Sequence, residues 1–216
     1  MSDPTATDLE VRGPHVGLRI PREEDAQRLF ELARDGEVTR FFSWGPYEEQ
    51  AEALAWLATL PQRRAEGIAL ELAIVDRDDW VIGIIAVLEV SKRDRRAVVG
   101  IWLGQAYWGT GASDESEALI AHLVFEHLRM ERFGAWVDVR NARSQGAFER
   151  IGFVREGTLR GWHRHGDERR DLISYSLLRD EWQQSPLAAV EVSVTGTVPE
   201  AFVCAQRPGE AVHAAD

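Results

Sequence analysis

The segment from residue 101 to residue 113 carries the strongest chemical signal in the sequence. It reads IWLGQAYWGTGAS, an apolar strand-like run that passes through Gly109 and Gly111 into a helical pattern. Consecutive backbone N–H groups in such a loop, backed by the positive end of a helix dipole, form a binding site for a diphosphate. Glycine suits the loop because a Cβ would obstruct phosphate oxygens and disfavour the required φ angles. We therefore predict an anion site at residues 108–113.

Two other phosphate-binding motifs fit this segment poorly. A P-loop ends in Gly-Lys-Ser/Thr, whereas Gly111-Ala112-Ser113 lacks the lysine. The dinucleotide-binding fingerprint requires a third glycine near Asp114, and none is present there. Taken alone, a Gly-x-Gly before a helix is more often a structural turn, so a second motif is needed to assign a function.

That second motif is an asparagine and a serine at the start of a predicted helix, followed by a Gly-Phe pair. The sequence reads NARS from Asn141 to Ser144, GF from Gly152, and EG from Glu156. Together with the glycine loop, it resembles the GNAT acyltransferases, and specifically their RimJ/RimL-like branch, which acetylates ribosomal-protein N-termini and many small amines. The resemblance extends from about residue 16 to residue 182.

The resemblance implies an acyl-CoA site between two strands that splay apart, at residues 99–103 and 133–139. In such enzymes the pantetheine arm lies in the gap as a pseudo-strand and the glycine loop holds the diphosphate, with acetyl-CoA or another acyl-CoA as co-substrate and no metal. Asn141 would contact the arm, although asparagine is also a preferred helix cap. The implied cofactor-binding residues are Ile101, Trp102, Leu103, Trp108, Gly109, Thr110, Gly111, Ala112, Ser113, Asn141, Ser144 and Phe148.

The sequence departs from the family pattern at several positions. Phe148 matches the tyrosine that serves as the acid elsewhere in the superfamily, so the pattern of this branch gives the role of protonating the departing thiolate to Ser144. Ala106 occupies a position where many GNAT proteins place Gln or Arg, so backbone amides must carry most of the phosphate binding. Val98 replaces a glutamate that is frequent in the branch, which removes one candidate base.

A base is needed because an alkylamine has a pKa near 10.4 and must lose a proton before its nitrogen attacks. His163 is our first choice, because an imidazole titrates near neutral pH. An exposed hairpin histidine is the alternative reading of His163. Glu89, a further candidate catalytic residue, and Glu71 are rivals on strands of the same sheet.

The acceptor pocket is predicted to be mainly apolar, as small-molecule sites commonly are. Phe42, Trp44 and Trp162 are candidate lining residues beside Glu71, although Trp44 fits core packing equally well. Three acids follow the glycine loop, and since they would repel a phosphate, we expect them to face away from it. They are Asp114, Glu115 and Glu117.

Composition narrows the class of protein. The chain has 216 residues, a formal net charge of −11 and one cysteine, Cys204. The negative charge argues against a nucleic-acid partner, and a lone cysteine without zinc-type spacing argues against a disulfide or a metal site. With no apolar run of about 18 residues and no secretory signal, we expect a cytoplasmic protein without membrane contact. Dimers are common in the branch, so a homodimer is one expectation.

Hydrophobic periodicity and turn signals predict the elements that position these residues. The predicted class is mixed α/β (α+β), a twisted and mostly antiparallel seven-stranded sheet flanked by helices, with acyl-CoA at a split between strands 4 and 5. Strands are expected at 17–20, 68–75, 80–90, 97–103, 133–139, from 153, and at 172–178, and helices after Pro21, around 54–60, at 113–129 and at 141–151. We expect a flexible N-terminus (1–10), one acyltransferase domain (11–184) and a poorly ordered segment (185–216), in which Val190, Val192 and Val194 alternate as in an edge strand.

These observations predict an acyl-CoA-dependent N-acyltransferase, most simply an N-acetyltransferase. The favoured acceptor is the primary amine of a small molecule such as an antibiotic or metabolite, because no basic surface for an RNA-rich partner is evident in the sequence. The N-terminus of a ribosomal or other protein is the alternative acceptor. A domain that senses acyl-CoA without catalysis is a third reading, permitted by the missing tyrosine and glutamate.

Overall fold

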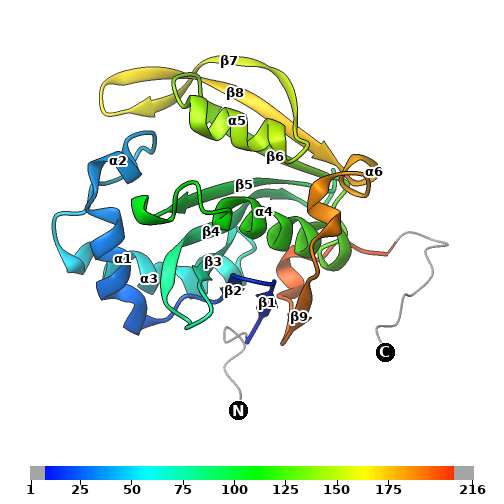
Figure 1. The fold of residues 1–216 in the computed structure, drawn as a ribbon, viewed down its shortest axis with the longest axis horizontal. Coiled ribbons are helices and arrows are strands. Elements are labelled where there is room, and N and C mark those ends of the chain that lie inside the picture. The colour runs from blue at the N-terminus through cyan, green and yellow to red at the C-terminus, as the bar shows by residue number, and fades with distance from the viewer. Residues whose placement is uncertain (1–7, 207–216) are drawn as a thin grey trace.

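A single mixed β-sheet organises the computed structural model, which describes residues 8–206. Within these residues the sheet has nine strands in the order β7-β8-β6-β5-β4-β3-β2-β1-β9 (Figure 1). The strands are β1 (Glu10–Arg12), β2 (Gly17–Arg19), β3 (Ala69–Val75), β4 (Val81–Ser91), β5 (Arg96–Leu103), β6 (Arg132–Asp138), β7 (Val154–His165), β8 (Glu168–Leu178) and β9 (Ser193–Thr195). The mixed α/β class and the mostly antiparallel sheet are confirmed.

The helices include one that continues into an irregular turn. The α-helices are α1 (Ala26–Ala33), α2 (Gly36–Thr39), α3 (Gln50–Ala65), α4 (Ala112–His122), α5 (Ala142–Arg150) and α6 (Arg179–Trp182). A single π-helical turn, Leu123–His127, extends α4, so the predicted helix at 113–129 is regular only in its first part. The short helix α2 was not anticipated from the sequence.

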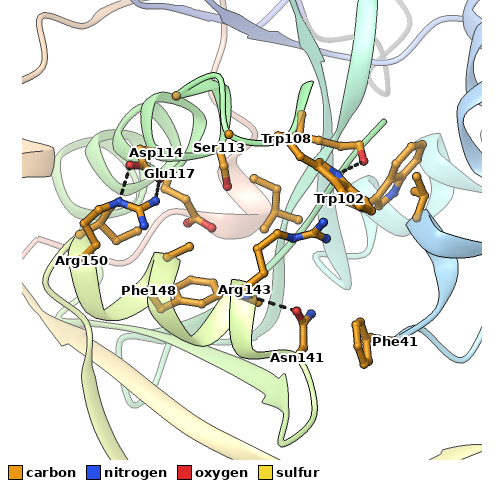
Figure 2. A pocket seen from close by; sticks show the side chains of 18 of the residues that line it. Phe41, Trp102, Trp108, Ser113, Asp114, Glu117, Asn141, Arg143, Phe148 and Arg150 are labelled. Carbon is orange, nitrogen blue, oxygen red and sulfur yellow. Dashed lines mark hydrogen bonds and ion pairs between the residues drawn. The ribbon is translucent and has the colours of Figure 1, made fainter. Parts of the chain in front are cut away.

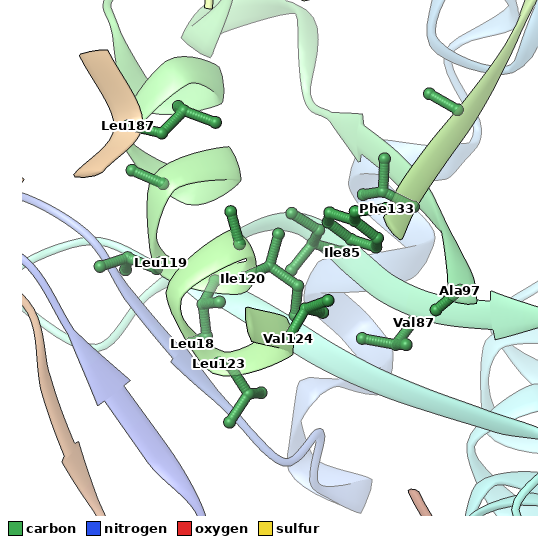
Figure 3. Packing of buried hydrophobic residues seen from close by; sticks show 14 of the residues in the cluster. Leu18, Ile85, Val87, Ala97, Leu119, Ile120, Leu123, Val124, Phe133 and Leu187 are labelled. Carbon is green, nitrogen blue, oxygen red and sulfur yellow. The ribbon is translucent and has the colours of Figure 1, made fainter. Parts of the chain in front are cut away.

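Two hydrophobic clusters lie on opposite faces of the sheet. Alternate residues of β3 enter different clusters, Leu72 in the larger and Ala73 in the smaller, as expected when successive side chains of a strand point to opposite faces. In the larger cluster, Ile120 and Val124 of the α4 segment pack near Ile85 (Figure 3). Helices α1 and α3 supply the smaller cluster. The central strands are therefore buried on both faces and form a rigid platform.

The sheet is larger than the seven strands expected. The chain before Gly17 forms β1, which pairs with β2, and β9 pairs with the other edge of β1, with Val11 opposite Val194. Both strands are only three residues long, which is too short for periodicity to identify with certainty. The alternation at Val190, Val192 and Val194 indicated an edge strand in this segment, although only Val194 of the three lies in β9.

The expectation of low order after residue 184 is wrong for residues 185–206. Leu187 and Phe202 are buried in the main core, and the N–H of Cys204 donates to the carbonyl of Leu128 at 3.0 Å. These few apolar side chains anchor a segment whose overall composition is typical of a mobile terminus. At the other end Leu9 is also buried. The expected flexibility of the N-terminus and the expected low order of the C-terminal segment also concern residues 1–7 and 207–216. These lie outside the described residues.

No helix within residues 8–206 combines the length and the apolar character needed to cross a membrane.

Candidate active site

Strands β5 and β6 separate partway along their length. They run parallel and pair only from Arg96 to Val99 of β5, opposite Arg132 to Ala135 of β6. Beyond that point β5 continues with β4 alone and β6 with β8 alone. The sheet therefore opens between residues 100–103 and residues 136–138, which is the split predicted from the sequence.

The open edge of β5 offers backbone groups to the gap. The N–H of Gly104 donates to the carbonyl of Ile82 at 2.9 Å, in the register that pairs Trp102 with Ile84. Since hydrogen bonding alternates along an antiparallel pair, the N–H groups of Ile101 and Leu103 point away from β4 and towards the split. An extended ligand can bind there as an additional strand, and these donors can also stabilise a developing oxyanion.

The glycine loop follows directly from β5 and leads into α4. Gly109 and Gly111 have φ angles of 74° and 92°, in the left-handed region that favours glycine. Gly111 is the N-cap of α4, so the first N–H groups of the helix have no intrahelical partner and the positive end of its dipole faces the loop. The indole Nε1 of Trp108 donates to the carbonyl of Leu103 at 2.9 Å and fixes the loop to the strand. The loop thus has the backbone geometry of an anion site.

A cavity of about 510 Å³ connects the split, the loop and helix α5 (Figure 2). This volume lies within the range of roughly 300–1,000 Å³ that is usual for small-molecule sites. The cavity is lined by Val38, Phe41, Phe42, Ile101, Trp102, Leu103, Trp108, Gly109, Gly111, Ser113, Asp114, Glu117, Asn141, Arg143, Ser144, Ala147, Phe148, Arg150 and Ile151. Most of the cofactor-binding residues predicted from the sequence meet in it.

Asn141 caps α5 and also faces the cavity. Its side-chain oxygen accepts a hydrogen bond from the N–H of Ser144 at 3.2 Å, so its amide NH₂ can still donate to a ligand. The two readings of Asn141 are therefore compatible. Ser144, one turn further on, and the buried Phe148 line the same wall.

Two arginines of α5 reach across the cavity to the loop and to α4. The guanidinium carbon of Arg143 lies 3.3 Å from the centroid of the Trp108 ring. Arg150 pairs with Asp114 through Nη2 at 2.7 Å and Nε at 3.0 Å. These contacts tie α5 to the glycine loop and to α4, and they place two cations beside a cavity whose lining has no lysine.

The acids after the glycine loop do not all face away from it. Glu115 does, because its carboxylate accepts the N–H groups of His15 and Val16 at 2.6 and 3.0 Å. Asp114 and Glu117 line the cavity, contrary to expectation. The Arg150 pair offsets the charge of Asp114, and burial raises the pKa of Glu117 to about 8, with a smaller contribution from Asp114. Glu117 is therefore mostly neutral at pH 7.

Several predicted residues support the cavity without lining it. Ala112 is buried in the first turn of α4, and the Thr110 hydroxyl donates to the carbonyl of Tyr107 at 2.9 Å. Trp44 packs behind two lining residues, with ring centroids 5.3 Å from Phe42 and 5.6 Å from Trp102. Trp44 therefore supports the aromatic part of the cavity wall from behind.

Two of the predicted glutamates lie away from the cavity. Glu89 is four residues beyond Ile85, which pairs with Ile101, so it lies about 13 Å further along β4, towards the unsplit end of the sheet. Glu71 is buried and ion-paired with Arg63 of α3 at 2.8 Å. Glu89 therefore does not lie at the split between β5 and β6, as a catalytic base would. Glu71 does not line the cavity, as a substrate-binding residue would.

The other two residues predicted for the acceptor side, Trp162 and His163, lie on the β7–β8 hairpin. Trp162 is 54 % exposed and packs edge-on against Trp136, with ring centroids 5.3 Å apart, so it does not line the cavity. His163 does not line it either, but its buried Nε2 has no hydrogen-bond partner. His163 pairs in register with Arg170, which donates to the carbonyl of Arg40 at 3.1 Å. That contact joins the hairpin to the loop that carries Phe41 and Phe42.

Glu156 of the predicted motif has a structural role. Its carboxylate accepts from Arg132 at 2.7 Å, Ser174 at 3.2 Å and Ser176 at 3.0 Å. The Arg132 hydrogen bond, followed by those of the serines, lowers the pKa of Glu156 to about 2 although partial burial opposes this. Glu156 therefore fastens β7 to its neighbours.

Sequence reasoning missed six residues of the cavity wall besides Asp114 and Glu117. Helical spacing contained a signal for several of them, since Arg143, Ala147 and Arg150 lie three or four residues apart on the helix that carries Ser144. Likewise Glu117 follows Ser113 by one turn. The other missed residues, Val38, Phe41 and Ile151, come from the α2 region and the end of α5.

The chain matches known proteins over most of its length. Residues 15–154 match the family model "Acetyltransferase (GNAT) domain". N-acetyltransferase p20 of Bacillus licheniformis, itself uncharacterized, is 28 % identical and covers 76 % of this chain and 93 % of its own. Spermidine N(1)-acetyltransferase of Escherichia coli K12 is 25 % identical, covering 67 % and 75 %. The ribosomal-protein-serine acetyltransferase of the same strain is 24 % identical, covering 51 % and 62 %.

The fold agrees with this match. The crystal structure of the microcin C7 self-immunity acetyltransferase MccE, in complex with acetyl-CoA and AMP, superposes with a TM-score of 0.70 at 20 % identity, covering 76 % of this chain and 92 % of that one. The chain belongs to the GNAT acetyltransferases and fits their RimJ/RimL-like branch. It is an N-acetyltransferase of that family.

Proposed function

We propose that this protein transfers an acetyl group from acetyl-CoA to the primary amine of a small molecule. The observation that carries the proposal is the opening between β5 and β6, which leads directly to the Gly109–Gly111 loop at the start of α4. An extended pantetheine arm requires a free strand edge, and a diphosphate requires free N–H groups at a helix start. Both features meet in one cavity.

The residues of the cavity fit acetyl-CoA in order along its length. The loop and the first turn of α4 bind the diphosphate through backbone N–H groups. Asn141 donates its amide to the pantetheine arm, and the open edge of β5 at Ile101 and Leu103 pairs with it. In this proposal the thioester lies beside Ser144, near the aromatic end of the cavity.

Acetyl transfer then needs one proton donor and one proton acceptor. The amine nitrogen forms a bond to the thioester carbonyl carbon, and the N–H groups of β5 stabilise the oxyanion. As the carbon–sulfur bond breaks, the Ser144 hydroxyl protonates the thiolate. His163 takes the proton that leaves the amine, through water, because its Nε2 is unpartnered and lies on the hairpin that contacts the acceptor loop. The products are an amide and CoA with a free thiol, and water returns a proton to Ser144 and takes one from His163 before the next turnover.

The aromatic end of the cavity favours an amine acceptor. Phe41, Phe42 and Trp102 line it, and Trp44 packs behind Phe42 and Trp102. The faces of such rings attract ammonium groups, and the net charge of −11 attracts cationic substrates over longer distances. A polyamine is one member of this class, in line with the similarity to spermidine N(1)-acetyltransferase.

A protein N-terminus is the second candidate acceptor. The similarity to a ribosomal-protein-serine acetyltransferase favours it, although it covers only 51 % of this chain. An N-terminal amine requires the same chemistry at the thioester. Only the acceptor side of the cavity distinguishes the two candidates.

The test is a thiol-release assay with acetyl-CoA against a panel of alkylamines, polyamines, aminoglycosides and short peptides. We expect CoA release that depends on an added small amine, with the acetylated product confirmed by mass spectrometry. Release with peptides alone would establish the second candidate. Tight acetyl-CoA binding without turnover for any acceptor would instead indicate a sensor, and Ser144→Ala would then have no activity to lose.

A further inference from the structure

Glu117 is a buried carboxyl group inside the cavity that the reaction described above does not use. Its side chain is 3 % exposed, and its Oε2 atom is buried without a hydrogen-bond partner. Figure 2 shows the carboxyl projecting from α4 into the cavity in the direction of Phe148. A buried polar group without a partner costs about 1–3 kcal/mol, so the position calls for a ligand that supplies the missing hydrogen bond.

The position of Glu117 along α4 indicates which part of a ligand it meets. Ser113 lies four residues earlier on the same helix face, at the phosphate end of the cavity, and both residues line it. Phe148 faces the same space from α5. Glu117 thus lies one helical turn deeper than the anion site, where the chain attached to a bound diphosphate continues towards the split.

The charges that line this part of the cavity are few. Asp114 of α4 is paired with Arg150 of α5, and Arg143 of α5 lies over Trp108. The lining residues of β5 and of the glycine loop carry no charge, and Glu115 is engaged on the other side of α4 by the N–H groups of His15 and Val16. None of these cations is hydrogen-bonded to Glu117. An ionised Glu117 would add an uncompensated negative charge beside a diphosphate.

We propose that Glu117 binds the co-substrate as a neutral acid, with its carboxyl O–H donating a hydrogen bond to an oxygen of the acetyl-CoA arm next to the diphosphate. This inference rests on the proposed function and adds a cofactor-binding residue to it. The protonated form agrees with the raised pKa of about 8, and binding of a polyanion raises this pKa further by linkage. Loss of the proton removes the donor and places like charges together.

The expected signature is a loss of acetyl-CoA affinity at alkaline pH. At one unit above its pKa an acid is about one-tenth protonated, so Kd should rise about tenfold between pH 7 and pH 9. Acetyl-CoA is a better probe than CoA, because the CoA thiol itself titrates in the alkaline range. Binding is measured by calorimetry, or by quenching of the cavity tryptophans Trp102 and Trp108.

Glu117→Gln is the matched variant, because its amide can still donate a hydrogen bond but does not ionise. We expect it to bind acetyl-CoA at pH 7 within about threefold of the wild-type protein and to bind equally well at pH 9. Glu117→Ala should bind about tenfold more weakly at pH 7, as expected for loss of one hydrogen bond in a buried site. Circular dichroism at both pH values confirms that each variant is folded.

The outcomes separate this inference from the proposed function. If the wild-type protein binds acetyl-CoA equally at pH 7 and pH 9, or if Glu117→Gln weakens as steeply as the wild type, the inference is wrong while the acetyl-CoA site stands. If the folded wild-type protein does not bind acetyl-CoA at either pH, the proposed function is wrong and the inference falls with it.

Discussion

The guanidinium of Arg143 lies over the indole ring of Trp108, with its central carbon 3.3 Å from the ring centroid. This contact joins α5 to the glycine loop across the cavity. It also places a cation next to a loop whose anion site otherwise consists of backbone N–H groups. Arg143 is thus positioned both to hold the cavity in shape and to neutralise a bound diphosphate.

Replacing Arg143 with alanine should therefore weaken acetyl-CoA binding. Hydrogen bonds to charged groups contribute about 1.5–3 kcal/mol, so Kd should rise roughly tenfold to one-hundredfold, with a weaker dependence on salt concentration. Arg143→Lys is the control, because it retains the charge but not the planar stacking. An unchanged Kd and salt dependence in Arg143→Ala would show that the arginine only covers the loop.

Ser144→Ala should separate chemistry from binding. Ser144 lines the cavity from the first turn of α5, and the cap made by Asn141 uses the backbone N–H of Ser144, which the variant keeps. If Ser144 is the acid, kcat should fall by about 10²-fold or more, while the Kd of acetyl-CoA changes little. Comparable losses in affinity and turnover would instead point to a binding role for the hydroxyl.

Gly111→Ala tests the backbone geometry of the anion site. Gly111 has a φ of 92°, and a Cβ there would meet no atom within 4 Å. We therefore expect the free energy of unfolding to fall by about 1–2 kcal/mol, because alanine is strained at this φ angle. We also expect weaker acetyl-CoA binding, because the N–H groups of the loop would reorient. Gly146→Ala is the matched control, since it is a helical glycine of α5 that also has no neighbour within 4 Å.

Gly146→Ala should stabilise the protein by about 0.5–1 kcal/mol, because alanine is the better helix former. Urea unfolding measures both glycine variants. A Gly111→Ala variant as stable and as active as the wild type would contradict the assigned role of the loop.

The raised pKa of Glu117 predicts an unusual dependence of the free energy of unfolding on pH. In the unfolded chain its carboxyl ionises near the ordinary pKa of 4.5, and in the folded protein near about 8. The folded state therefore holds a proton that the unfolded state releases, so this group makes the free energy of unfolding fall as pH rises from about 4.5 to about 8, with no further change above that.

Glu117→Leu should remove this dependence. The variant is expected to gain on the order of a few kcal/mol relative to wild type at pH 8 and little at pH 4.5, while binding acetyl-CoA more weakly. Thermal unfolding at the two pH values gives the comparison. A stability difference that is the same at both would show that Glu117 ionises normally in the folded protein.

The sequence was informative wherever a motif is local. The glycine loop and the Asn141 helix start follow from residues that are close in the chain and carry specific backbone requirements, whereas the split between the two strands was implied by the family resemblance. The structure has the backbone geometry that these motifs require, including the left-handed φ angles of Gly109 and Gly111. Strand positions also agreed to within a few residues, because the central strands are long and strongly apolar.

What the sequence could not provide depends on packing between distant segments. Glu89 and Glu71 were plausible bases by residue type, but only the register shows that Glu89 is towards the unsplit end of the sheet, and only the tertiary structure pairs Glu71 with Arg63. Similarly, the order of residues 185–206 depends on a few buried anchors such as Phe202. The pairing of Asp114 with Arg150 joins residues 36 positions apart.

Calorimetric titration of the folded protein with acetyl-CoA tests the central claim most directly. The account predicts saturable binding at one site per chain, with Kd below about 1 mM as is usual for enzyme substrates, and a clear loss of affinity in Gly111→Ala. Absence of binding to acetyl-CoA and to longer acyl-CoA thioesters would contradict the account.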